Sequence, residues 1–298
     1  MLEKKLIKLS LTALAALVLT ACGSSGGDGD SSSDSAVNKV ENSAKKVEDK
    51  AKDVVNKVEA AGDKYHGGSV TLNVEDGKPA NAIYAAVSSN DYGKIKVDGK
   101  EMSVLKQNQY SGIYSGRWMI INNEAVCCGN VLDYVQVGYT VKGNNAIAYY
   151  NGELTALKDI PQSNKVKYAT TNSAMVGLFD LDGTKEKDAL RAMNFSPELT
   201  ADFDAKKLTG SIYASTKSND KDRKEMVTLQ ADIKGNKFAG TASLVNLDKA
   251  DIERANLQSE AEKTAQLNGA FYGPNAANVA GIAHNEKWGV VFAAEKQK

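Results

Sequence analysis

Gly269-Ala270-Phe271-Tyr272-Gly273-Pro274-Asn275-Ala276-Ala277 lies near the end of the chain and is followed by Gly289-Val290-Val291-Phe292-Ala293-Ala294-Glu295-Lys296. Both stretches hold a short apolar run that contains aromatic or β-branched residues, and the first run ends in glycine, proline and asparagine. Such runs are typical of β-strands, and such endings are typical of turns. They predict that the chain ends in the strands of a β protein.

The same pattern extends back to about residue 165, where short apolar runs alternate with turn residues. We expect eight strands in residues 165–298, and an even number of short strands favours closure into an antiparallel barrel that leaves no exposed edge. The expected strands are Val166–Thr170, Ala174–Asp180, Leu199–Asp204, Gly210–Ser215, Val227–Ile233, Lys237–Leu244, Val279–Ala283 and Gly289–Ala294, with Phe271 and Tyr272 leading into the seventh.

The interior of an eight-stranded barrel is filled by side chains. The residues expected in this core are Leu199, Phe203, Ile212, Phe238 and Phe292. Two longer charged segments, 182–196 and 246–268, are expected to be loops, and the second to hold a short helix.

A second β domain is predicted at residues 65–158, so the fold class is all-β. Its expected strands are separated by Asp76-Gly77, Asp98-Gly99 and Gly143-Asn144-Asn145, which favour hairpins. Nine of the twelve tyrosines of the chain lie in this part. We expect an open or β-sandwich-like antiparallel domain, with the boundary to the barrel near residues 159–164.

The N-terminus has the features of a lipoprotein signal peptide. Lys4, Lys5 and Lys8 precede a short apolar run, which ends in Leu19-Thr20-Ala21-Cys22. This run is too short to span a membrane, and its ending is typical of a cleavage site before a lipid-modified cysteine. We expect residues 1–21 to be removed and Cys22 to carry diacylglyceryl and N-acyl groups, which anchor a protein stably. Because Gly23 follows instead of an aspartate, the outer membrane is favoured over the inner membrane.

The anchor is expected to be separated from the β domains by two segments. Residues 22–33 form a tether rich in glycine, serine and aspartate. Residues 34–61 show a heptad pattern that predicts an amphipathic helix. A solvated spacer helix is favoured over a self-associating coiled coil, because the apolar positions are only valine and alanine: Val37, Val40, Ala44, Val47, Ala51, Val54 and Val58.

Composition argues against several classes of protein. The chain has 37 basic and 37 acidic residues and no basic stripe interleaved with aromatics, so nucleic acid is not expected as a partner. No catalytic motif is present, and no metal site is expected. Of the two histidines, His284 is expected to be a polar residue of the last hairpin turn.

The barrel region resembles a known family. The residues that carry the resemblance are Leu199-Thr200-Ala201-Asp202-Phe203-Asp204, Leu208-Thr209-Gly210-Ser211-Ile212, Ile233 to Ala242 and Gly269 to Asn275. They are similar to the C-terminal barrel of the transferrin-binding protein B superfamily, which includes Slam-dependent surface lipoproteins, factor H-binding protein, the haemoglobin–haptoglobin receptor lipoprotein and hemophilin-type haem proteins. The resemblance covers about the last 130 residues. It implies a β-rich handle domain ahead of the barrel, a barrel that is read by an outer-membrane translocon, and a handle that holds the ligand.

Tyrosine, tryptophan and arginine are the residue types most common at binding hot spots. Such residues cluster in the handle, where the candidates for ligand binding are Tyr110, Tyr114, Arg117 and Trp118. Gly112–Ile120 is expected to be one strand, on which Tyr114 and Trp118 would share a face. Half of the cluster would then be structural, and Tyr110 is favoured over Trp118 as a contact.

Haem binding is the alternative function, because iron needs an axial histidine, tyrosine, methionine or cysteine in an apolar slot. His66, beside Tyr65, is the possible haem ligand, with Tyr110 and Tyr114 as further candidates. No other cofactor is expected.

Cys127 and Cys128 are adjacent, and Cys22 is expected to carry lipid. In an exported protein a vicinal disulfide is favoured over two free thiols. The pair could stiffen its loop or offer an apolar contact to a ligand, whereas a metal role would need further ligands nearby.

Together these features predict a surface-exposed outer-membrane lipoprotein that captures a host serum protein without catalysis. A complement regulator or an iron-carrying protein, such as transferrin or haemoglobin, would fit a role in immune evasion or nutrient acquisition. A purely structural envelope lipoprotein is the third possibility, but it would not explain the aromatic content of the handle.

Overall fold

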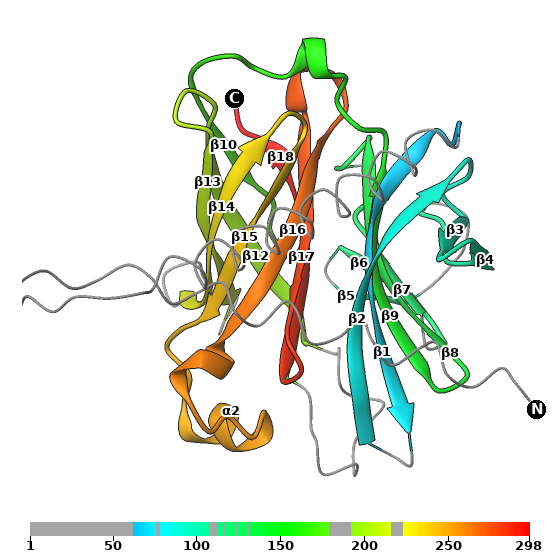
Figure 1. Ribbon diagram of the computed structural model, residues 1–298, viewed down its shortest axis with the longest axis vertical. Helices are drawn as coiled ribbons and strands as arrows, with labels where there is room; N and C mark the ends of the chain where they lie inside the picture. The colour runs from blue at the N-terminus through cyan, green and yellow to red at the C-terminus, as the bar shows by residue number, and fades with distance from the viewer. Residues whose placement is uncertain are drawn as a thin grey trace, which may run out of the picture. The chain divides into compact units, whose positions relative to one another are not determined.

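The computed structural model describes residues 62–75, 78–107, 113–115, 117–122, 124–129, 131–178, 192–215 and 223–298. The predicted signal peptide, Cys22, the tether and the spacer helix lie outside these residues. The described residues belong to one compact unit, which holds two β-sheets (Figure 1).

The first sheet, which we call the handle, has nine antiparallel strands in the order β4-β3-β2-β1-β9-β8-β7-β6-β5. It is a single open sheet. The strands are β1 (Tyr65–Glu75), β2 (Lys78–Ser89), β3 (Lys94–Val97), β4 (Lys100–Ser103), β5 (Ile113–Ser115), β6 (Trp118–Ile121), β7 (Glu124–Cys127), β8 (Val135–Lys142) and β9 (Asn145–Gly152). The predicted turn at Asp98-Gly99 joins β3 to β4, and both residues have positive φ, as a tight hairpin requires.

The second sheet is the barrel. Its strands are β10 (Lys165–Ala169), β11 (Ala174–Leu178), β12 (Ala192–Asp202), β13 (Lys207–Ser215), β14 (Arg223–Lys234), β15 (Lys237–Leu244), β16 (Thr264–Tyr272), β17 (Asn278–His284) and β18 (Trp288–Lys296). A 3-10 turn, η1 (Leu157–Asp159), lies in the connection between the two sheets. The short helix expected in the 246–268 segment is α2 (Lys249–Arg254), which Asp248 caps in a capping box.

The barrel is closed and has eight strand positions around its circumference, which we call staves. β12 pairs with β13 and completes the ring. β10 and β11 together make one interrupted stave, because both lie between β12 and β18 at successive heights: β10 pairs with residues 198–202 of β12 and β11 with residues 192–195. The predicted fold of a handle followed by a closed eight-stranded barrel is therefore confirmed.

One strand was missing from the prediction. Residues 264–268, expected in a loop, belong to β16, which pairs with β15 over residues 264–270 and with β17 over residues 266–272. The count of eight was still right because β10 and β11, expected as separate strands, form one stave. β12 also begins earlier than expected, at Ala192.

The apolar runs near the C-terminus are explained by burial on both faces. Along β16, β17 and β18, alternate residues point into the barrel core, including Phe271, Val279 and Phe292. The residues between them, including Tyr272 and Ile282, join a second core shared with the handle. A strand buried on both sides has no polar face, so its sequence reads as a continuous apolar run.

The five residues predicted for the barrel core are all buried in it. Phe271 lies at the centre of an aromatic cluster, with ring centroids 5.2 Å from Phe203, 5.6 Å from Phe238 and 6.0 Å from Tyr168. Among the described residues no helix is long and apolar enough to cross a membrane.

Candidate functional site at the handle and its junction with the barrel

Three tyrosines line the junction between handle and barrel. The hydroxyl groups of Tyr84 on β2 and Tyr150 on β9 lie 3.2 Å apart, and the rings of Tyr150 and Tyr272 on β16 make an edge-type contact with centroids 6.5 Å apart. Tyr272 Oη donates a hydrogen bond to the backbone oxygen of His66 (3.2 Å). Burial raises the pKa of all three hydroxyls above the ordinary value, so they remain neutral and act as hydrogen-bonding groups.

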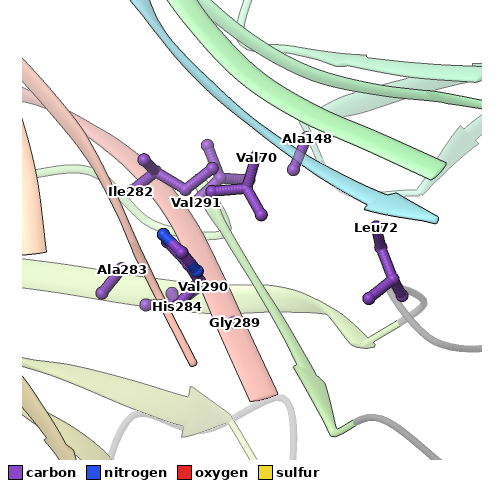
Figure 2. A pocket seen from close by; sticks show the side chains of 9 residues that line it. All are labelled: Val70, Leu72, Ala148, Ile282, Ala283, His284, Gly289, Val290 and Val291. Carbon is purple, nitrogen blue, oxygen red and sulfur yellow. The ribbon is translucent and has the colours of Figure 1, made fainter. Parts of the chain in front are cut away.

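A small apolar cavity lies at the same junction (Figure 2). Its volume is about 10 Å³, which is the lower limit for one water molecule. It is too small for a cofactor. Its lining comes from both sheets: Val70, Leu72 and Ala148 of the handle, and Ile282, Ala283, His284, Gly289, Val290 and Val291 of the barrel.

His284 is the one polar side chain in this lining, and it differs from the prediction. It ends β17 and stacks on Tyr84 of the handle, with ring centroids 6.4 Å apart and planes 8° apart. Both ring nitrogens are buried and have no hydrogen-bond partner. The expectation of a polar turn residue was wrong, because the handle covers this end of the strand and removes the ring nitrogens from water.

Burial lowers the pKa of His284 below its ordinary value of 6.5. In the unfolded chain the imidazole takes up a proton near pH 6.5, whereas the folded protein resists that proton. The free energy of unfolding is therefore expected to fall as pH drops below 6.5, by up to about 1.4 kcal/mol per pH unit for this single group. Urea denaturation at pH 7.5 and pH 5.5 measures the effect.

The matched variant is His284→Phe, which keeps a flat ring beside Tyr84 and removes the titrating group. The free energy of unfolding of this variant should fall less between pH 7.5 and pH 5.5 than that of the wild type, because the contribution of His284 is absent. Equal pH dependence in the two proteins would show that the histidine is not held neutral at the junction.

His66 lies near the start of β1. Successive side chains of a strand point to opposite faces, so residues 66, 68, 70 and 72 lie on the same face of β1. Val70 and Leu72 on that face belong to the core shared with the barrel. The ring nitrogen Nδ1 is buried without a hydrogen-bond partner. Because this face packs on the barrel wall, the structure places His66 beside the junction.

The cluster of ligand-binding candidates spans a hairpin and not one strand. β5 and β6 pair with Tyr114 opposite Met119 and Ser115 opposite Trp118. Tyr114 and Trp118 therefore do not share a face, as a single strand would have required. Tyr110 and the side chain of Tyr114 lie outside the described residues, so their role stays a prediction.

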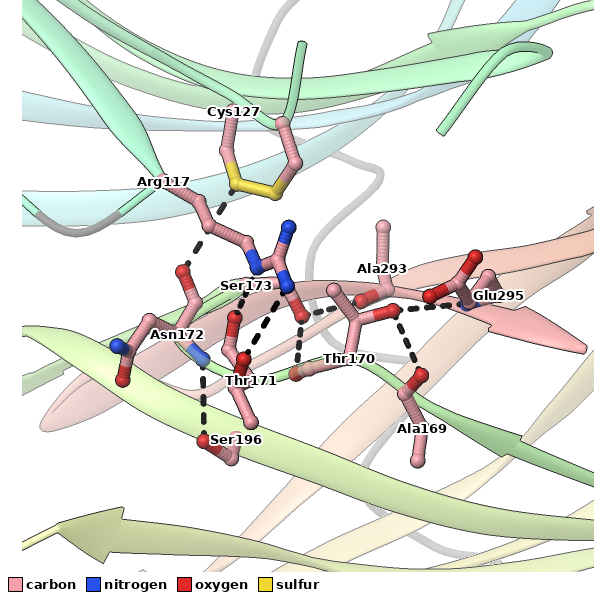
Figure 3. Close-up of a disulfide and its surroundings, with 11 residues drawn as sticks. Arg117, Cys127, Ala169, Thr170, Thr171, Asn172, Ser173, Ser196, Ala293 and Glu295 are labelled. Atoms are coloured by element: carbon pink, nitrogen blue, oxygen red, sulfur yellow. Dashed lines mark hydrogen bonds between the residues drawn. A yellow bond between two sulfur atoms is a disulfide. The ribbon is translucent and has the colours of Figure 1, made fainter. Parts of the chain in front are cut away.

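Arg117 is engaged within the chain (Figure 3). Its Nε donates a hydrogen bond to the backbone oxygen of Thr171 (2.8 Å), and its terminal nitrogen contacts Thr171 Oγ1 (3.4 Å). Thr171 lies in the short break between β10 and β11, where Asn172 N donates to Ser196 Oγ. The interrupted stave of the barrel is thus the point at which the β5–β6 hairpin is attached.

Trp118 was a candidate ligand contact, and for this residue the prediction was wrong. Its side chain is fully buried and belongs to the core that handle and barrel share. A side chain with no exposed surface offers nothing to a partner. Its indole nitrogen is also buried without a hydrogen-bond partner.

The sulfur atoms of Cys127 and Cys128 are joined in a disulfide at the end of β7 (Figure 3). Both residues are fully buried, and Cys127 Sγ lies 3.9 Å from the backbone oxygen of Asn172 in the barrel. This position suits a role in shaping the junction better than one as an exposed contact for a ligand. Among the described residues there is no group of side chains that could hold a metal ion.

Sequence comparisons place these features in a family. Residues 160–296 match the family described as C-lobe and N-lobe beta barrels of Tf-binding protein B. An uncharacterised protein of Haemophilus influenzae is 33% identical over 98% of this chain and 99% of its own length. Transferrin-binding protein B of Neisseria meningitidis serogroup B is 28% identical over 71% of this chain. The chain spans only 36% of the length of that relative.

Solved structures show the same fold. The crystal structure of isotype 1 transferrin-binding protein B from serogroup B N. meningitidis matches with a TM-score of 0.52 and 24% identity, over 77% of this chain and 43% of that one. A variant of transferrin-binding protein B from Haemophilus parasuis matches with a TM-score of 0.51 and 23% identity, over 77% and 45%.

An open handle sheet packed on a closed eight-stave barrel is thus the fold that this chain shares with these structures of transferrin-binding protein B. The barrel of this chain, residues 160–296, belongs to the family of transferrin-binding protein B beta barrels.

Proposed function

We propose that this protein is a lipid-anchored lipoprotein on the outer surface of a bacterial outer membrane, where it captures a host protein. The observation that carries the proposal is the match of one handle and one barrel to transferrin-binding protein B, a protein named for binding transferrin. The sequence around Cys22 supplies the anchor, and a Slam-type translocon would deliver the barrel to the surface.

The class we propose is a serum protein, either an iron carrier of the transferrin kind or a complement regulator. A tyrosine contributes a large contact area at a low cost in conformational entropy, which favours Tyr110 and Tyr114 as contacts, whereas Tyr139, Tyr149 and Tyr150 of the handle are buried.

Haem capture through His66 is not favoured. His66 lies on the face of the handle that packs on the barrel, and the cavity at the junction is of the size of a water molecule. Transferrin-binding protein B, to which this chain is similar, is named for binding a protein.

A test in intact cells addresses anchor, exposure and capture together. Bacteria that produce the chain are incubated with host serum, washed, and analysed for retained serum proteins before and after mild protease treatment. We expect one retained serum protein, which is lost when protease removes the chain from the surface. A chain that resists protease on intact cells and retains nothing would contradict the proposal. A Cys22→Ala variant, which cannot be acylated, is the control for anchoring.

The loop prediction concerns Tyr110 and Tyr114. Replacing both by alanine should weaken capture of the serum protein by about tenfold or more, because aromatic hot spots commonly contribute more than 1 kcal/mol each. The amount bound to the immobilised protein over a serum dilution series measures this. Tyr213→Ala is the matched control, because it removes a tyrosine from the barrel and not from the handle. The Tyr213 ring lies under Arg223, with the guanidinium carbon 4.3 Å from the ring centroid. If the control weakens capture and the loop variant does not, the barrel wall is the contact surface.

A further inference from the structure

One corner of the contact between handle and barrel is closed by a histidine. We call it the histidine corner, and it consists of His284, the turn 285–287 that follows it and residues 82–86 of β2. The His284 ring stacks on Tyr84, and Figure 2 shows it among apolar side chains of both sheets. On β16 its register partner is Gln266, which is exposed. The corner therefore lies at the border between the shared core and solvent.

The His284 ring has no polar partner for either of its nitrogens, and both nitrogens are buried. A neutral imidazole carries one N–H donor and one acceptor, whereas an imidazolium carries two N–H donors and a charge. Burying a polar group without a hydrogen bond costs free energy, and burying an unpaired charge costs more. The closed corner thus holds the neutral ring at some cost and the charged ring at a larger one.

The groups that face the ring are apolar or neutral. β2 contributes the hydroxyl of Tyr84, which stays neutral because burial raises its pKa. The residues that β1, β9 and β18 contribute to the lining of the cavity carry no ionisable group: Val70, Leu72, Ala148, Gly289, Val290 and Val291. Charged side chains follow in the turn, at Glu286 and Lys287, but neither bonds to a ring nitrogen. Among the described residues, nothing compensates a charge on His284.

The other histidine of the chain is placed differently. His66 also has a buried nitrogen without a partner, Nδ1. However, a carboxylate lies close to it. The pKa of Asp63 is lowered by the hydrogen bond from Ser88, by Lys96 and, as the smallest contribution, by the charge of His66. A proton on His66 is therefore balanced by a negative charge, and a proton on His284 is not.

The size of the effect decides how far the junction opens. One titrating group changes an equilibrium by at most about tenfold per pH unit. Separating the whole handle from the barrel would expose the shared core, which includes Trp118, Tyr150 and Tyr272. The hydrophobic cost of exposing such side chains is far larger than one proton can offset. Opening is therefore confined to the corner.

We propose that the histidine corner opens in response to pH: in a mildly acidic medium His284 takes up a proton and turns out to water, and the β17–β18 turn moves away from β2 while the shared core stays closed. The closed corner is most stable above pH 6.5, where the ring is neutral in the folded and in the unfolded chain. It loses stability as the pH falls below 6.5, because an open corner accepts the proton and a closed corner does not.

Hydrogen exchange followed by mass spectrometry measures the opening at pH 7.5 and pH 5.5, with each rate corrected for the intrinsic exchange rate at that pH. We expect the protection of residues 82–86 and 282–290 to fall by up to about tenfold at pH 5.5. Residues 208–212, whose buried side chains belong to the barrel core, should keep their protection. An equal fall in all three segments would show general unfolding and would overturn the proposal.

The variant that tests the proton is His284→Phe, which keeps a flat ring beside Tyr84 and has no group to protonate. Its corner should show the same protection at both pH values. The matched control is His66→Gln, which removes the other histidine and should open like the wild type. A wild-type corner that does not respond to pH, or a His284→Phe corner that responds equally, would show that His284 does not control the opening.

A second measurement does not depend on the folding of the His284 variant. The chain has two histidines, so His66→Gln leaves His284 as the only source of imidazole signals in the nuclear magnetic resonance spectrum. We expect these signals to titrate below pH 6.5, and titration at or above pH 6.5 would contradict the proposal. Neither measurement depends on whether the protein captures a serum protein, so this inference and the proposed function can fail separately.

Discussion

Replacing Phe271 by alanine is expected to lower the free energy of unfolding by about 3–5 kcal/mol, the usual cost of removing a fully buried phenylalanine. The ring is surrounded by Phe203, Phe238 and Tyr168, so the cavity left behind cannot be filled by a small movement of one neighbour. A loss of this size is a large part of the stability of an ordinary domain. Urea denaturation followed by circular dichroism measures it.

Phe271→Leu is the control, because it keeps most of the volume and should cost less than about 1.5 kcal/mol. If the alanine variant lost less than about 1 kcal/mol, the aromatic cluster would not be the centre of the barrel core.

Trp118→Ala is expected to destabilise the protein by a similar amount, about 3–5 kcal/mol. The indole is fully buried in the core that the handle shares with the barrel. Trp118→Phe should recover most of the loss, because it keeps an aromatic ring and also removes the indole N–H, which is buried without a partner.

The same variants test whether the two sheets unfold together. The chain has two tryptophans, Trp118 in the handle and Trp288 in the barrel core. Trp118→Phe leaves Trp288 as the fluorescent reporter of the barrel, and Trp288→Phe leaves Trp118 as that of the handle. In each variant we expect the fluorescence of the remaining tryptophan and the circular dichroism of the whole protein to change in one transition, at the same urea concentration. A handle that unfolds well before the barrel would show that the shared core contributes little.

Most of the barrel could be predicted from the sequence, because its turns and its apolar alternation are local signals. The strand that was missed, β16, starts with Thr264-Ala265-Gln266-Leu267-Asn268-Gly269, which has few β-branched or aromatic residues. Its conformation is set by pairing with β15 and β17, which a local pattern does not report. The single interrupted stave made by β10 and β11 likewise depends on long-range register.

The junction between the sheets was harder to predict than either sheet. The continuous apolar runs of β17 and β18 indicate burial on both faces, and this signal could have shown that the handle packs there. Nothing local distinguishes His284 from a turn residue, since its burial depends on Tyr84, 200 positions earlier in the chain. The roles of Arg117 and Trp118 also depend on the hairpin at residues 113–121. The sequence was interpreted there as one continuous strand, so the turn between β5 and β6 was not predicted.

Capture of a host protein is tested most directly by passing whole host serum over the immobilised chain, residues 34–298, and measuring what remains after a moderate-salt wash. We expect one serum protein, bound in a fixed stoichiometric ratio to the chain. An eluate that cannot be distinguished from that of bare resin would contradict it, and a Soret band on titration of the same protein with haemin would then assign the chain to haem binding.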